Sequence, residues 1–172
     1  MYSVGHSTHQ LEELLELLRH FGIAVLADVR TAPRSRRVPQ LDREVLARAC
    51  KAGGLFYLHI PQLGGWRTPR QGSPNAGWRA EAFRGYADHL ATPEFAALVE
   101  IAEQRPTAYM CAEADWTRCH RRLVSDALLV RGRRVRHIAG TADSQEHVLT
   151  PFAVVDGESV TYPAEGGQGT LL

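Results

Sequence analysis

The sequence predicts an α/β fold with an open, doubly wound, mostly parallel sheet of the Rossmann-like kind, followed by a C-terminal hairpin. Three observations support this prediction. Short β-rich runs alternate with amphipathic helical runs, glycines stop several of the helical runs, and an Asp-Gly pair near the carboxyl end is typical of a hairpin turn. Such alternation implies a parallel sheet covered on both sides, and right-handed crossovers favour the strand order 3-2-1-4-5.

Five β-rich runs are expected to form the sheet, at residues 2–7, 24–30, 55–60, 107–112 and 134–139. The first helix is expected to follow a capping box formed by Ser7 and Gln10, because these residues precede a leucine stripe of helical period. The remaining helices are expected over 42–52, 79–90, 93–104 and 116–131.

The whole chain, residues 1–172, is expected to form a single domain, since no repeat marks an internal boundary. A hairpin over 152–163 should turn at Asp156-Gly157, and the glycine-rich residues 164–172 should form a loose tail. The chain shows neither a basic-then-apolar leader nor an apolar run of membrane-spanning length, so a cytoplasmic location without membrane attachment is expected. Three cysteines, an odd number, do not suggest a disulfide framework.

The net charge of +1 argues against a generally basic surface that coats nucleic acid. Nearly all of the positive charge is arginine, because Lys51 is the only lysine. This bias reflects either a GC-rich genome or the recognition of phosphate and carboxylate by planar guanidinium forks. Two loops stand out: the arginine-rich residues 31–40, and the Gly- and Pro-rich residues 61–78, which are too long for a simple connection.

Ionisable and polar side chains gather where the predicted strands end. They are His6, Ser7, Asp28, Arg30, His59, Cys111, Glu113 and, inside the last strand, His137. In open parallel sheets ligands bind outside the carboxyl ends of the strands. We therefore expect the functional site at this edge of the sheet.

Seven short segments occur in a fixed order along the chain: "GHST" at 5–8, "DVR" at 28–30, "LGG" at 63–65, "RGYADHL" at 84–90, "MCAE" at 110–113, "CHR" at 119–121 and "HI" at 137–138. Together they resemble the family called domain of unknown function 488, over a core of about residues 3–139. The resemblance implies a small α/β protein and draws attention to these residues. It implies no particular reaction.

The segment "CAEADWTRCHR" at 111–121 leaves three interpretations open. The first is a metal site. The sequence predicts no resident cofactor, but if a divalent metal ion is bound, Cys111, Cys119 and His120 are its candidate ligands, with His6 as an additional one. The C-x7-C-H spacing matches no tight zinc-knuckle signature, and the adjacent Cys119 and His120 are expected to point in different directions.

The second interpretation is a cysteine-dependent enzyme similar to phosphatases or sulfurtransferases. Cys119 is expected in or near the first turn of the helix over 116–131, where the helix dipole favours a thiolate, unless it is a packing residue. The phosphatase pattern C-x5-R would need arginine at position 117, where the chain has Thr117. Glu113 and Asp115 would also repel a phosphate from this loop.

The third interpretation places acid–base chemistry on carboxylates and histidine. Glu113 or Asp28 would act as general base and His6 as acid or orienting group, while Arg30 and Arg121 clamp a phosphate between them. Further substrate contacts are expected from Ser7, Arg36, Asn75 and His120. Trp66 and Trp78 offer surfaces on which a base can stack.

The sequence thus predicts an enzyme that acts on a phosphate-bearing substrate such as a nucleotide or nucleic acid. Its expected catalytic residues are Glu113, Asp28, His6 and Cys119. The alternatives are a non-catalytic module that binds nucleotide or nucleic acid, and the cysteine-dependent enzyme.

Overall fold

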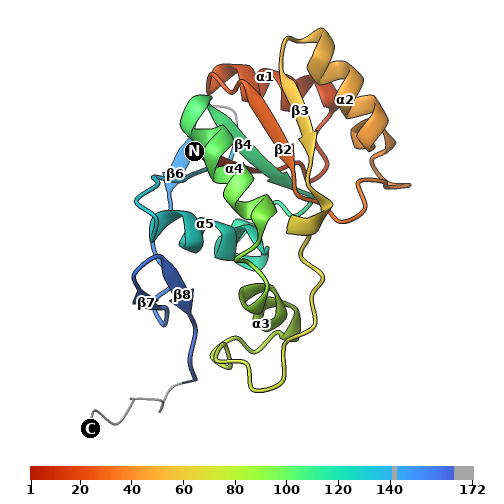
Figure 1. The fold of residues 1–172 in the computed structure, drawn as a ribbon. Helices are drawn as coiled ribbons and strands as arrows, with labels where there is room; N and C mark the ends of the chain where they lie inside the picture. The colour runs from red at the N-terminus through yellow and green to blue at the C-terminus, as the bar shows by residue number, and fades with distance from the viewer. Residues whose placement is uncertain (141–142, 165–172) are drawn as a thin grey trace, which may run out of the picture.

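The computed structural model describes residues 1–140 and 143–164, and its centre is a six-stranded, mostly parallel sheet (Figure 1). The strands of this sheet are β1 (Tyr2–Gly5), β2 (Val25–Asp28), β3 (Phe56–His59), β4 (Thr107–Cys111), β5 (Arg136–Ile138) and β6 (Ser144–Glu146). All neighbouring pairs are parallel except β5 with β6.

Helices cover both faces of the sheet. They are α1 (Leu11–His20), α2 (Arg43–Ala52), α3 (Glu81–Asp88), α4 (Pro93–Gln104) and α5 (Arg121–Leu129). α1 and α2 pack on one face against Leu26 and Met110, whereas α4 and α5 pack on the other against Ala27 and Tyr109. Because successive strand residues point to opposite faces, each strand contributes to both apolar cores. The predicted fold class, a doubly wound α/β sheet, is confirmed.

The predicted strand order 3-2-1-4-5 is wrong, because the structure has the order β3-β2-β4-β1-β5-β6. The long connection through α3 and α4 returns β4 across β2 to the middle of the sheet. Ala108, Tyr109 and Met110 of β4 are fully buried, and a central position covers both faces of such an apolar strand. Local patterns reveal strands and helices, but strand order depends on contacts between distant segments, which they do not encode.

Two predicted helix starts also differ from the structure. Glu13 Oε2 accepts from the backbone N of Gln10 at 2.9 Å, so α1 is capped at Gln10 and not at Ser7, which has a φ of 45°. The helix expected over 116–131 is divided into a short 3-10 helix, η3 (Trp116–Arg118), and α5. Cys119 lies between them in an extended conformation, close to the first turn of α5.

The carboxyl end of the described chain adds one unpredicted strand and one predicted hairpin. β6 pairs antiparallel with β5 at an edge of the sheet. β7 (Val154–Asp156) and β8 (Ser159–Thr161) form the expected hairpin, in which Gly157 has a φ of 58°. The expected loose tail falls almost wholly on residues 165–172, outside the described residues. Within the described chain, no helix is long and apolar enough to cross a membrane.

Candidate functional site

The carboxyl ends of three neighbouring strands bring the site residues together. β4 lies between β2 and β1, with Met110 beside Asp28 and Cys111 beside Gly5. The backbone N of His6 donates to Cys111 O at 2.9 Å, which extends this alignment beyond the strands. The central place of β4 therefore puts its cysteine between the groups that follow the other two strands.

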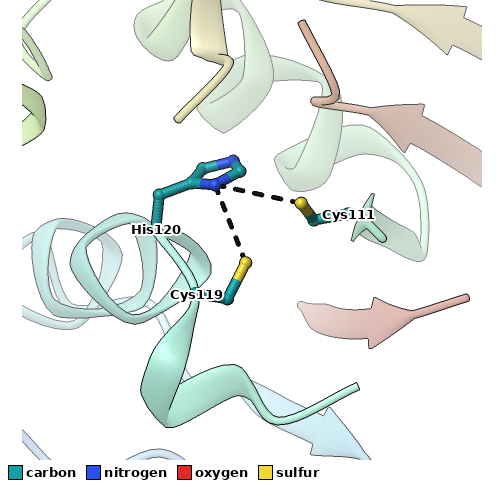
Figure 2. A group of neighbouring side chains, drawn as sticks. All are labelled: Cys111, Cys119 and His120. Carbon is teal, nitrogen blue, oxygen red and sulfur yellow. Dashed lines mark hydrogen bonds between the residues drawn. The ribbon is translucent and has the colours of Figure 1, made fainter. Parts of the chain in front are cut away.

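Cys111, Cys119 and His120 form a cluster at this edge (Figure 2). Cys111 is the last residue of β4, and His120 is the N-cap of α5. His120 Nδ1 lies 3.6 Å from Cys119 Sγ and 3.9 Å from Cys111 Sγ. All three donor atoms lie within 4.8 Å of one another. We call this group the Cys–His cluster.

Adjacent residues in a helix diverge, but Cys119 and His120 converge because the chain changes conformation between them. Cys119 is extended, with φ −118° and ψ 150°, whereas His120 already has helical angles of −57° and −17°. The turn from η3 into α5 thus aims both side chains at Cys111. The expectation that these two side chains point apart is wrong.

The pKa values of the two cluster thiols shift in opposite directions. The interaction with Cys111 is the largest influence that lowers the pKa of Cys119, and His120 and Arg121 act in the same direction. The interaction with Cys119, followed by burial, raises the pKa of Cys111. Arg121 Nε contributes directly, since it donates to Cys119 Sγ at 3.5 Å. Cys119 is therefore the more acidic thiol of the pair.

Arg121 holds the loop between the two cysteines and does not reach into the cleft. It is only 1% exposed, and its Nη2 donates to the carbonyl oxygens of Glu113 and Ala114. Its Nη1 donates to Ser3 Oγ at 3.4 Å. A loop whose carbonyls face a buried cation is not an oxyanion cradle, and the predicted phosphate clamp of Arg30 with Arg121 is not formed.

Arg30 is held at the floor of the site by its own neighbours. Its Nε and Nη2 donate to the two carboxylate oxygens of Asp28 at 2.8 and 2.6 Å, and Tyr57 also donates to Asp28. His6 Nε2 accepts from Arg30 Nη1 at 2.9 Å, while His6 Nδ1 donates to Ser7 O. Burial and then the positive charge of Arg30 lower the pKa of His6 to about 4. Asp28 and His6 thus position Arg30, and the roles of base and acid expected for them do not fit this geometry.

Two adjoining hollows, each of about 350 Å³, open over this edge. The first, the cysteine hollow, is lined by Arg30, Thr31, Ala32, Arg34, Gly65, Trp66, Cys111, Ala112 and His120. The second, the arginine hollow, includes His6, Ser7, Arg34, Arg37 and Glu113. They share Arg30 and Arg34, so a ligand can extend from one hollow into the other.

The rim of these hollows carries exposed charge and one exposed aromatic ring. Arg34 and Arg37 are exposed, and within residues 1–140 and 143–164 neither forms an ion pair. Trp66 is 87% exposed although it lines the cysteine hollow. Glu113 is exposed in the arginine hollow, where its Oε1 accepts from the backbone N of Asp115.

Several predicted site residues lie elsewhere. Asn75 is buried, donates to Asp88 Oδ1 and accepts from the backbone N of Tyr162, so it fastens the hairpin segment to the 61–78 loop. Trp78 is buried among aromatic rings that include Phe152. Arg36 is exposed but lines neither hollow.

A second polar group, which the sequence indicated only through His137, lies buried beside the site. Asp126 accepts from His147 Nε2 at 2.9 Å and also from Thr150 and Tyr162. His147 Nδ1 lies 3.0 Å from His137 Nε2, and His137 Nδ1 lies 2.6 Å from Ser3 Oγ. We call this group the histidine network. Its other members come from segments without a recognisable motif, so sequence patterns alone could not predict that they gather around His137.

Comparison with known proteins identifies a family and no individual relative. Searches of the curated proteins and of the solved structures find no match to this chain. A family model matches residues 10–128, which include the whole Cys–His cluster, Arg30 and the arginine-rich loop. The match covers more than half of the chain, so the protein belongs to the family described as Domain of unknown function DUF488.

Proposed function

We propose that the protein is an enzyme that transfers or hydrolyses a phosphate group of a nucleotide or of a nucleic-acid end, with the reaction at the Cys–His cluster. One observation carries this proposal. Arg34, Arg37 and Trp66 surround two connected hollows, and Cys111 and His120 line one of them. Guanidinium groups bind phosphate, and an exposed indole gives a base a surface to stack on.

The arginines that serve this function are not the pair expected from the sequence. Arg34 and Arg37 are exposed at the cleft and have no carboxylate partner in the described chain, so their forks are available to a ligand. Arg30 donates its Nε and Nη2 to Asp28, whose carboxylate balances its charge, so its fork is not available to a ligand.

The Cys–His cluster favours an enzyme over a module that only binds. Binding an anion requires positive charge at the rim, which the arginines supply. It does not require a buried thiol pair with an imidazole, whose desolvation costs free energy. Glu113 lies across the arginine hollow and is the exposed carboxylate that we assign to proton transfer.

Binding of adenosine monophosphate and of single-stranded DNA tests the ligand class. Arg34→Ala and Arg37→Ala should each weaken binding roughly tenfold, because one charge-assisted hydrogen bond contributes about 1.5–3 kcal/mol. Arg36→Ala is the matched control, since Arg36 belongs to the same loop but lines neither hollow. Affinity should fall as salt rises. Equal losses in all three variants, or salt-insensitive binding, would contradict the proposal.

Turnover is tested by phosphorus NMR of the same nucleotide and of a 5′-phosphorylated oligonucleotide. We expect release or transfer of phosphate by the wild type and its loss in Cys111→Ala, which removes an accessible member of the cluster. Tight binding without turnover of either substrate would favour the non-catalytic module.

A further inference from the structure

We infer that Cys111, Cys119 and His120 form a binding site for a soft divalent metal ion, with zinc as the first candidate, and that a fourth coordination position faces the cysteine hollow. The metal site stands on its own geometry. Only the catalytic place that we give the ion rests on the proposed function.

The distances between the three donor atoms are close to those of tetrahedral zinc. With Zn–S of about 2.3 Å and Zn–N of about 2.0–2.1 Å, tetrahedral geometry places two sulfurs about 3.8 Å apart and a sulfur and a nitrogen about 3.6 Å apart. His120 Nδ1 lies 3.6 Å from Cys119 Sγ and 3.9 Å from Cys111 Sγ, and no pair of donor atoms exceeds 4.8 Å. A small movement of Cys111 would complete the geometry.

The ligand types select a soft ion. Thiolate and imidazole prefer zinc and similar metals, whereas magnesium and calcium prefer oxygen ligands. The candidate metal ligands from the sequence were Cys111, Cys119 and His120, with His6 as an additional one. The structure excludes His6, because its Nε2 accepts from Arg30 and its Nδ1 donates to Ser7 O.

Arg121 makes the metal site rigid, and Gly65 leaves space beside the ligating nitrogen of His120. Arg121 donates to Cys119 Sγ and to two carbonyls of the intervening loop, so it fixes the separation of the cysteines and supports the negative charge of a bound thiolate. Gly65 packs against the imidazole, where an added Cβ would lie 2.5 Å from His120 Nδ1. A larger residue at Gly65 would therefore occupy the space beside the ligating nitrogen.

The number of protein ligands points to a catalytic and not a structural ion. Structural zinc has four protein ligands, whereas catalytic zinc has three and an open position. Among residues 1–140 and 143–164, the group of donor atoms contains only these three. Cys111 and His120 both line the cysteine hollow, so the open position faces the place where Arg34 would hold a phosphate. An ion there polarises a phosphoryl oxygen as a Lewis acid.

Metal binding is measured on the full-length protein after removal of metal with a chelator. We expect one zinc ion per chain by native mass spectrometry and by competition with a chromophoric chelator. Cobalt should give the thiolate-to-metal charge-transfer absorption and the visible bands of a tetrahedral site. Cys111→Ser and His120→Asn should each weaken zinc binding roughly a hundredfold or more, since even residues that only support a ligand contribute ten- to a hundredfold. Cys50→Ser, which removes the cysteine remote from the cluster, should bind as the wild type does.

The cobalt spectrum is measured on the wild-type protein, so it tests metal binding at the Cys–His cluster even if a substitution unfolds the chain. Absence of charge-transfer absorption, or zinc affinity unchanged in Cys111→Ser, would overturn the inference. Turnover that persists in excess chelator would overturn the catalytic place of the ion and leave the proposed function standing. One tightly bound zinc ion, together with nucleotide binding that ignores Arg34→Ala, would establish the metal site and defeat the proposed function.

Discussion

The Cys–His cluster and the histidine network lie next to each other, but they differ in how completely their buried polar groups are hydrogen-bonded. In the histidine network the hydrogen bonds run in one direction, from Arg121 through Ser3, His137 and His147 to Asp126. The four hydrogen bonds to the Asp126 carboxylate engage both of its oxygens. In the Cys–His cluster, by contrast, His120 Nε2 is buried without a partner in the described chain.

This difference leads us to assign a structural role to the histidine network and to propose a functional role for the Cys–His cluster. A buried polar group is stabilised when every donor meets an acceptor, and such a group has nothing left to offer a ligand. A cluster whose donor atoms converge beside a hollow can still bind a ligand, but its unpaired polar groups make the folded protein less stable. We therefore expect substitutions in the histidine network to affect folding and substitutions in the Cys–His cluster to affect binding and chemistry.

Asp126→Ala should have the largest effect on stability. It leaves His147, Tyr162 and both donors of Thr150 without their acceptor, each buried, so the free energy of unfolding should fall by about 3–5 kcal/mol. Chemical denaturation measures it. Cys111→Ser, the matched change in the open cluster, should cost less than about 1 kcal/mol. If Cys111→Ser lowers the free energy of unfolding by several kcal/mol and Asp126→Ala lowers it by less than about 1 kcal/mol, the division between a structural and a functional group is wrong.

Acid should destabilise the protein through histidines that are buried in the neutral form. Burial first, then nearby positive charge, lowers the pKa of His6 to about 4 and that of His137 to about 3. Below about pH 6.5 the unfolded chain binds protons that the folded chain does not, so stability falls as pH falls toward these values. Because of His6 alone, the free energy of unfolding should decrease by roughly 2–3 kcal/mol as the pH falls from 6.5 to 4.

The variant His6→Gln, whose carbonyl remains an acceptor for Arg30, tests this pH dependence. In urea denaturation across the same pH range, the free energy of unfolding should depend less steeply on pH than in the wild type. The difference in slope should correspond to close to one proton bound on unfolding. An unchanged slope would show that His6 titrates normally and that it does not serve as a neutral acceptor.

The sequence predicted that these polar residues gather at one edge of the sheet, but not how their side chains are arranged there. The rule for open parallel sheets needs only strand ends, and these were visible for Asp28 and Cys111. The convergence of Cys119 with His120 depends on a break between η3 and α5, which the amphipathic pattern over 116–131 concealed. The burial of Arg121 depends on the central position of β4 and on the backbone of its own loop. Neither a side chain's burial nor its partners follow from its type.

The alkylation rates of the three cysteines give the smallest expected effect, but they test most directly whether the Cys–His cluster differs from a fully buried group. Cys50 lies on the core side of α2 and is fully buried, and burial raises its pKa to about 11. Cys119 is the more acidic thiol of the cluster, because Cys111, His120 and Arg121 lower its pKa. In metal-free protein, Cys119 should therefore label at least roughly tenfold faster than Cys50, because reactivity follows thiolate character.

Pulse alkylation with iodoacetamide, followed by mass spectrometry across pH, measures the three rates separately. The Cys119→Ser variant removes the thiol that raises the pKa of Cys111, so it should speed labelling of Cys111 while leaving Cys50 unchanged. Zinc should protect both cluster thiols and have no effect on Cys50. If Cys119 labels no faster than Cys50 in the metal-free protein, the cluster is as closed as the histidine network, and "CAEADWTRCHR" is scaffold. The chemistry would then belong to Glu113 and the exposed arginines of the cleft.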